Sequence, residues 1–132
     1  MNYKELNNSL PNGLHDTDVT NIDIDYVNHV VTLTVNIWIG SMGETDLTKR
    51  EERKQAEIII RNFQYFVIDP PDPKYPYSES KPLWIDSGEF ADSRTKPRFP
   101  RTSSKYFRVS FFVNNWNSFI YFAAEDIEIK WK

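Results

Sequence analysis

The stretch GLHDTDVTNIDIDY, residues 13–26, brings one histidine and four aspartates together near the start of the chain. Imidazole nitrogens and carboxylate oxygens bind divalent metal ions in proteins, and both groups also transfer protons. A closed metal site needs three or four such ligands converging on one point. His15, Asp16 and Asp18 are therefore candidate metal ligands, and a metal-dependent enzyme centred on His15 and Asp16 is one hypothesis for the protein.

The same stretch also has a purely structural interpretation. Residues 20–26 alternate apolar and polar side chains, the period of two that predicts a half-buried β-strand. An aspartate at the start of a strand can accept backbone N–H groups in an Asx-type turn. This interpretation gives that role to Asp16 or Asp18, with His15 packing across the turn. His29 is expected at the far end of the strand, too distant to share a metal with His15. We favour this interpretation and expect no metal and no cofactor.

Other catalytic signatures are missing from the sequence. The chain has no cysteine, so it has neither a thiolate nucleophile nor a disulfide. It has no G-x-S-x-G motif, and Gly40 and Gly43 lack the following Lys-Ser/Thr of a phosphate-binding loop. Nineteen acidic residues produce many chance carboxylate pairs, so such pairs carry no information. We therefore expect a protein that is not an enzyme.

The composition and periodicity predict a sheet protein. Aromatic residues make up 15% of the chain and glycine occurs only four times, and aromatic side chains favour half-buried pleated surfaces. The run at 56–68 changes phase between Ile60 and Phe63, which predicts a β-bulge or a strand that passes between two sheets. Strands are expected at residues 20–26, 31–39, 56–68, 83–86 (an edge strand), 106–113, 119–124 and 127–131.

These elements predict an all-β fold: an antiparallel β-sandwich or partly open barrel of about seven to eight strands with two long loops. Residues 1–13 look like a flexible leader ending in the turn signal Pro11-Asn12-Gly13, and residues 14–132 form a single β domain. The charged segment 40–55 is expected to be a loop or to hold one helical turn after Asp46.

Charge is distributed unevenly along the chain. The net charge of −3 argues against a nucleic-acid binder. Residues 94–108 nevertheless carry six basic side chains and no acidic one. This basic run predicts contact with an acidic protein partner through Arg98, Phe99 and Arg101; the alternative is a solvated loop that balances upstream acids.

Three tryptophans are candidate contact residues. Trp38 is out of phase with the inward set of its strand, Trp84 stands between Leu83 and Ile85, and Trp116 lies in an expected turn. Outward aromatic rings stack on sugars or anchor a protein partner. The alternative is a second buried layer, and the sequence leaves the two open.

The cellular location is expected to be cytoplasmic. The first residues are polar, unlike a signal peptide, and no apolar run approaches the roughly 18 residues of a membrane span. The lack of cysteine fits a reducing compartment.

Several stretches resemble a group of small bacterial β proteins, some of which are regarded as immunity proteins of toxin systems. These stretches are Leu14-His15-Asp16, Ile22-x-Ile24-Asp25-Tyr26, a hairpin ending near Trp38, YFRVSFFVNNWNSFIYFAA and EDIEIKW. Thr17 departs from the small residue expected after Asp16, and residues 69–104 lie outside the resemblance. The resemblance implies no catalytic residue.

Together these observations predict a non-catalytic protein-binding module of the immunity type. Its contact surface is expected in the loops 69–82 and 88–105, with Trp84, Arg98, Phe99 and Arg101 as anchors. The first alternative is a small-ligand or carbohydrate-binding β-module that uses Trp38 and Trp116. The second alternative is the metal-dependent enzyme.

Overall fold

One antiparallel sheet of eight strands dominates the protein, in the order β5-β8-β7-β6-β2-β3-β4-β9. The computed structural model describes residues 1–75, 82–88, 100 and 102–132, with the backbone alone at 87 and 88. The all-β prediction is confirmed. The elements are α1 (Tyr3–Ser9), β1 (Pro11–Leu14), β2 (Thr17–Asp25), β3 (Val30–Trp38), α2 (Leu47–Arg50), β4 (Arg53–Arg61), β5 (Tyr65–Ile68), β6 (Leu83–Gly88), β7 (Phe107–Val113), β8 (Ser118–Ala124) and β9 (Asp126–Trp131).

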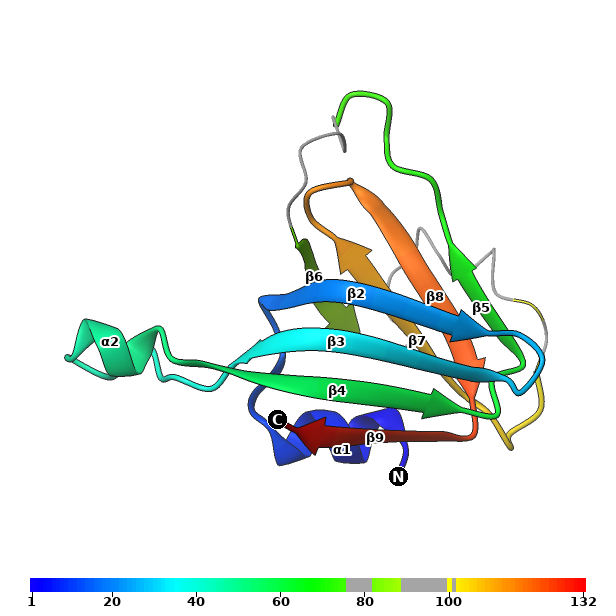
Figure 1. The fold of residues 1–132 in the computed structure, drawn as a ribbon, viewed down its shortest axis with the longest axis horizontal. Coiled ribbons are helices and arrows are strands. Elements are labelled where there is room, and N and C mark those ends of the chain that lie inside the picture. Colours follow the sequence, from blue (N-terminus) through cyan, green and yellow to red (C-terminus); the bar gives the residue numbers. More distant parts are fainter. Residues whose placement is uncertain (76–81, 89–99, 101) are drawn as a thin grey trace.

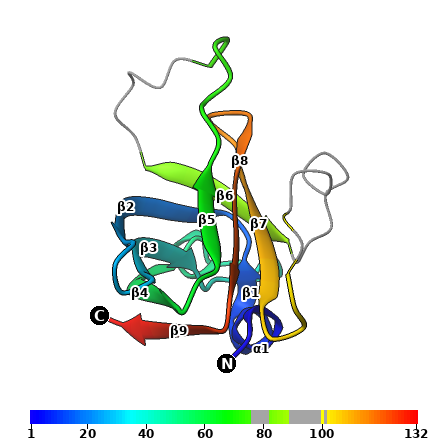
Figure 2. The same cartoon turned by 90° about the vertical axis from the view of Figure 1, so that its right-hand side faces the viewer.

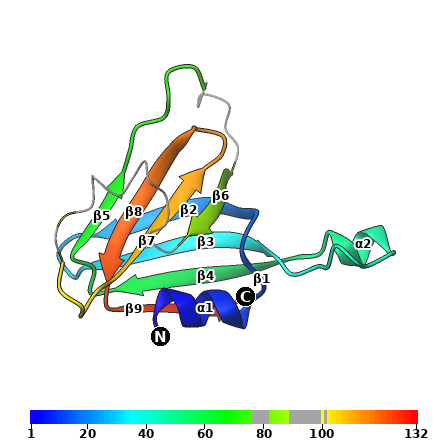
Figure 3. The ribbon, with the colours of Figure 1, turned by 180° about the vertical axis from the view of Figure 1, so that it is seen from behind.

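The sheet folds over on itself. Strands β2, β3, β4 and β9 form one half, and β5, β8, β7 and β6 form the other; β2 and β3 cross in front of β7 and β8 (Figure 1). Seen from behind, the second half lies nearest the viewer (Figure 3). Strands β5 and β9 stand at the two ends of the strand order, so the sheet remains open. This is the partly open barrel or sandwich that the alternation predicts.

The core lies between the two halves and follows the period of two. On β3, Val31, Leu33, Val35 and Ile37 all face inward and are buried. On β7 and β8 the inward residues include Phe111 and Phe122, whose ring centroids are 5.5 Å apart. Burying side chains of this size stabilises the fold by about 1.5–3 kcal/mol each.

The phase change in residues 56–68 marks a corner at which the chain passes from one half to the other. Strand β4 ends at Arg61, Asn62 adopts a φ of +54°, and β5 then pairs with β8 instead of β9. Asparagine tolerates this left-handed conformation better than most residues. The prediction of one continuous strand over residues 56–68 is therefore wrong: the phase change separates two strands, β4 and β5, of the same sheet. A bulge does occur elsewhere, between Val19 and Asn21 on β2.

The prediction of a flexible leader at residues 1–13 is wrong. Asn2 and Glu5 form a reciprocal capping box that starts α1, and Tyr3 and Leu6 bury their side chains. The helix runs alongside β9 (Figures 1 and 3). A seven-residue helix is too short to show clear apolar periodicity; the capping-box spacing was its visible signal.

Two further predictions need correction or refinement. In the segment 40–55, Asp46 caps the one-turn helix α2 by accepting a hydrogen bond from the Thr48 N–H (2.9 Å). This is one of the two predicted alternatives, a loop or one helical turn. The helix and its flanking residues project away from the sheet (Figure 1). Strand β4 begins at Arg53, inside the same segment. Strand β6 is not an edge strand, because it lies between β7 and β2 and pairs with both (Figure 2).

Candidate functional site

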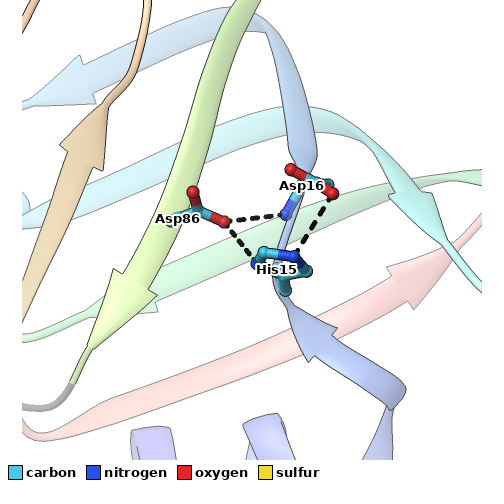
Figure 4. Close-up of side chains that lie close together, drawn as sticks. All are labelled: His15, Asp16 and Asp86. Carbon is cyan, nitrogen blue, oxygen red and sulfur yellow. Dashed lines mark hydrogen bonds and ion pairs between the residues drawn. The ribbon is translucent and has the colours of Figure 1, made fainter.

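The most concentrated polar chemistry in the described residues lies where the β1–β2 turn meets β6. The turn carries His15 and Asp16, and β6 carries Asp86 (Figure 4). Thr17 pairs with Ile85 across the two strands, so the residues next to this pair, 16 and 86, are brought together. Asp16 has a φ of +52°, a left-handed conformation that aspartate adopts more readily than most residues.

The imidazole of His15 lies between the two carboxylates. Its Nδ1 is 2.6 Å from Oδ1 of Asp86, and its Nε2 is 3.3 Å from Oδ2 of Asp16 (Figure 4). Each ring nitrogen therefore faces a different carboxylate. Both contacts are hydrogen bonds at the same time only when both nitrogens carry a proton, which is the imidazolium form.

Neutral donors hold the outer oxygens of the two carboxylates. The indole Nε1–H of Trp84 donates to Oδ1 of Asp16 at 2.7 Å. The side-chain amide of Asn114 donates to Oδ2 of Asp86 at 3.0 Å. The backbone N–H of Asp16 also donates to Oδ1 of Asp86, at 3.1 Å. Each carboxylate thus has one oxygen on a neutral side-chain donor and the other directed at His15.

Asp86 is held in its charged form. Burial by itself raises the pKa of this carboxyl, but the hydrogen bonds from Asn114 and from the Asp16 backbone, with the positive charge of His15, lower the pKa below its ordinary value. The His15 side chain is 59% exposed, so one side of the cluster is open to solvent.

Asp18 does not join this cluster. Its carboxylate lies 3.8 Å from Arg53, whose guanidinium also donates to the backbone oxygen of Asp16 at 2.6 Å. Asp86, not Asp18, is the third member of the cluster. Nothing local marks Asp86, because it lies 70 positions from Asp16 and only strand pairing brings the two together. The structural interpretation also had the acceptor wrong, since Asp86 accepts the backbone N–H at the start of β2.

The predicted aromatic residues have different surroundings. Trp38 is buried, donates to the backbone oxygen of Arg50 at 2.7 Å and packs 6.2 Å from the His15 ring, which leaves no face for a sugar. The predicted stacking role of Trp38 is therefore wrong, and this ring belongs to a second buried layer. Trp116 is partly buried against the core, whereas Trp84 is 47% exposed.

The predicted basic anchors cannot be placed in the same way. Arg98, Phe99 and Arg101 lie outside the described residues, as does most of the 88–105 loop. Their role stays a prediction. None of the helices in the described part of the chain is long and apolar enough to cross a membrane.

Comparison with known proteins assigns the chain to no family. No family model and no curated protein matches the sequence. Among solved structures, the chain is similar to an uncharacterised protein from Neisseria gonorrhoeae, with 16% sequence identity and a TM-score of 0.49. The match covers 88% of this chain and 91% of that one.

Proposed function

We propose that the protein is a non-catalytic protein-binding module of the immunity type, acting in the cytoplasm, and that Trp84 lies at the centre of its contact surface. The observation that supports this most is the state of Trp84, whose side chain is 47% exposed although its indole N–H is held by Asp16 at 2.7 Å. Tryptophan is among the residues that most often dominate binding energy at protein interfaces.

The backbone of Trp84 is held as firmly as its side chain. Its N–H donates to the side chain of Asn115 at 3.2 Å, and its carbonyl accepts from the N–H of Asn114 at 2.8 Å. Asn115 also donates to the carbonyl of Pro82 at 3.1 Å. A ring fixed in this way loses little conformational entropy when a partner covers it, which favours affinity.

The surface around Trp84 has the polar character of an interface rim. Asp16, Asp86 and His15 lie beside the ring, and Arg53 reaches the same turn. In this proposal, Arg98, Phe99 and Arg101 also contact the partner, which is acidic. A rigid central aromatic residue surrounded by polar groups matches the usual anatomy of a protein interface.

The experiment compares Trp84→Ala with Trp131→Ala. Trp131 is a matched control, because it is 41% exposed but lies on β9 with the Lys54 ammonium over its ring. The proposal predicts that the partner is encoded by a neighbouring reading frame, so the product of that frame is the protein to test. In isothermal titration calorimetry, Trp84→Ala is expected to weaken binding by about 30-fold, the equivalent of a ~2 kcal/mol hot spot, while Trp131→Ala leaves it unchanged.

Two results contradict the proposal. The first is that the neighbouring protein does not bind the unmodified chain at micromolar concentrations. The second is that both tryptophan variants bind it equally well. Circular dichroism and thermal unfolding of both variants establish that a loss of binding is not a loss of fold.

A further inference from the structure

We propose that His15 and Asp16 bind a divalent transition-metal ion of the Zn²⁺ class, with Asp86 orienting the imidazole from behind. The three residues offer ligand atoms that all lie within 4.8 Å of one another. This site is independent of the proposed protein-binding function and can exist without it.

The arrangement of the ring decides which atoms serve as ligands. One imidazole gives one nitrogen to an ion, and Nδ1 already makes a 2.6 Å contact with Asp86. Metal-bound histidines almost always donate their other ring N–H to a carboxylate or a carbonyl, which fixes the tautomer and the ring orientation. Asp86 is placed to do this, so Nε2 is the nitrogen that is left for a metal.

The space between Nε2 and Asp16 has the dimensions of a metal site. Nε2 and Oδ2 of Asp16 are 3.3 Å apart. A tetrahedral zinc ion with bonds of 2.0–2.1 Å separates neighbouring ligand atoms by about 3.3 Å. The separation of Nε2 and Oδ2 therefore matches the spacing of two neighbouring ligand atoms around such an ion.

The Asp16 carboxylate is oriented as well. Trp84 donates to its Oδ1 at 2.7 Å, which leaves Oδ2 directed toward the imidazole. The 59% exposure of His15 gives water access to the remaining coordination positions. Two protein ligands with water in the other positions make an open site, in contrast to the closed four-ligand sites that serve structure alone.

The local charge favours a cation. Asp16, Asp18 and Asp86 surround the turn, and Arg53 is the cation that reaches them in the described residues. With the imidazole neutral in the bound state, three carboxylates face one guanidinium and the surroundings stay negative. The guanidinium also contacts the backbone oxygen of Asp16, which keeps it off the Oδ2 atom that the ion needs.

The test is zinc titration of the purified protein by calorimetry in a non-chelating buffer near neutral pH. The unmodified chain is expected to bind one Zn²⁺ per molecule and to unfold at a higher temperature in its presence. His15→Gln and Asp16→Asn abolish binding. Asp86→Asn weakens it roughly 10- to 100-fold, because an orienting residue changes affinity without being a ligand.

His29→Asn is the matched control. It removes the other histidine, at a position where φ is +58° and asparagine is tolerated. This variant is expected to bind zinc as the unmodified chain does.

A second readout uses Co²⁺, which gives intense visible absorption in a tetrahedral site. This absorption should appear with the unmodified chain and disappear with His15→Gln. The proposal fails if the unmodified chain binds no zinc at millimolar concentration, or if His15→Gln still binds. It also fails if Asp86→Asn loses binding as completely as His15→Gln, since Asp86 would then be a ligand. Zinc binding without partner binding overturns the proposed function alone.

Discussion

Two turns of this protein use the same residue types with different results. The β2–β3 turn contains Asp25 and His29, and the β1–β2 turn contains Asp16 and His15. Each turn places one of these residues in the left-handed region, with φ of +58° at His29 and +52° at Asp16. The two turns differ in where their side chains find partners.

In the β2–β3 turn the aspartate is satisfied locally. Asp25 accepts from the backbone N–H groups of Val27 (3.0 Å) and Asn28 (2.9 Å) and from the Asn28 side chain (2.8 Å). His29 lies near the backbone oxygen of Phe63 at 3.1 Å. This is ordinary turn chemistry, in which a short polar side chain completes its own turn.

In the β1–β2 turn the partners come from the other half of the sheet. Asp16 accepts from Trp84, 68 positions away, and His15 faces both Asp16 and Asp86. The residue types therefore do not make a site by themselves. A site arises where β6 brings a second carboxylate and an indole to a turn whose side chains are not already used.

The largest expected effect comes from Asp86→Ala. This change removes the acceptor for His15, Asn114 and the Asp16 backbone, and donors left without an acceptor cost about 2 kcal/mol of unfolding free energy. Asp25→Ala, which disturbs one exposed turn, is expected to cost less. Urea unfolding monitored by circular dichroism compares the two variants. An equal loss of unfolding free energy in both would contradict the claim that the two turns differ in their partners.

A smaller effect, about 1 kcal/mol at position 29, is expected from backbone conformation. Alanine disfavours the left-handed region and asparagine tolerates it. At position 29, the Ala variant is therefore expected to be less stable than the Asn variant by this amount. At position 16 the difference should be larger, because Asn still offers an oxygen to the Trp84 indole. Thermal unfolding of the four variants checks this.

Smaller still is the coupling between side chains. A double-mutant cycle of His15→Gln with Asp86→Asn is expected to show an interaction energy of about 0.5–1 kcal/mol, since solvent screens the half-exposed pair. The cycle of His15→Gln with Asp25→Asn is expected to be additive within about 0.5 kcal/mol. Coupling of equal size in both cycles would contradict the separation of the two turns.

The smallest effect is a shared sensitivity to acid. Hydrogen bonds from Asn28 lower the pKa of Asp25, and the pKa of Asp86 is lowered against the opposing effect of burial. Both carboxyls have a folded-state pKa below the unfolded value of 3.8, so each stabilises the protein above that pH and loses this contribution as the pH falls further. Asp86→Asn and Asp25→Asn are each expected to flatten the fall in stability below about pH 4, measured as the urea midpoint.

The parts of the fold that sequence reasoning predicted are those with local causes. The β2–β3 and β7–β8 hairpins follow from alternation around a short polar turn, and the one-turn helix α2 follows from Asp46 as its cap. Strand β6 was expected at an edge because it is short. Its central place depends on pairing with β2 and β7, which no local pattern contains.

The candidate site likewise contains residues that the local sequence predicts and residues that it does not. His15 and Asp16 are adjacent in the sequence and were singled out by type and spacing. Asp86 was missed, because its proximity depends on the pairing of Thr17 with Ile85. Trp84 is predicted to lie at a contact surface, but no local pattern in the sequence predicts its hydrogen bond to Asp16. The chemically active residues of a turn can thus be identified from its own sequence, whereas their partners on distant strands cannot.

Two strand pairings between distant residues have a consequence for how the chain folds. Arg61 at the end of β4 pairs with Asp126 at the start of β9, and Tyr65 at the start of β5 pairs with Ala123 near the end of β8. Both pairings join residues far apart in the sequence, and folds dominated by such contacts fold in about milliseconds to seconds. During translation, the backbone edge of β4 that pairs with β9 stays without this partner until β9 has left the ribosome. Binding by a holdase chaperone over that interval would protect the nascent chain from aggregation.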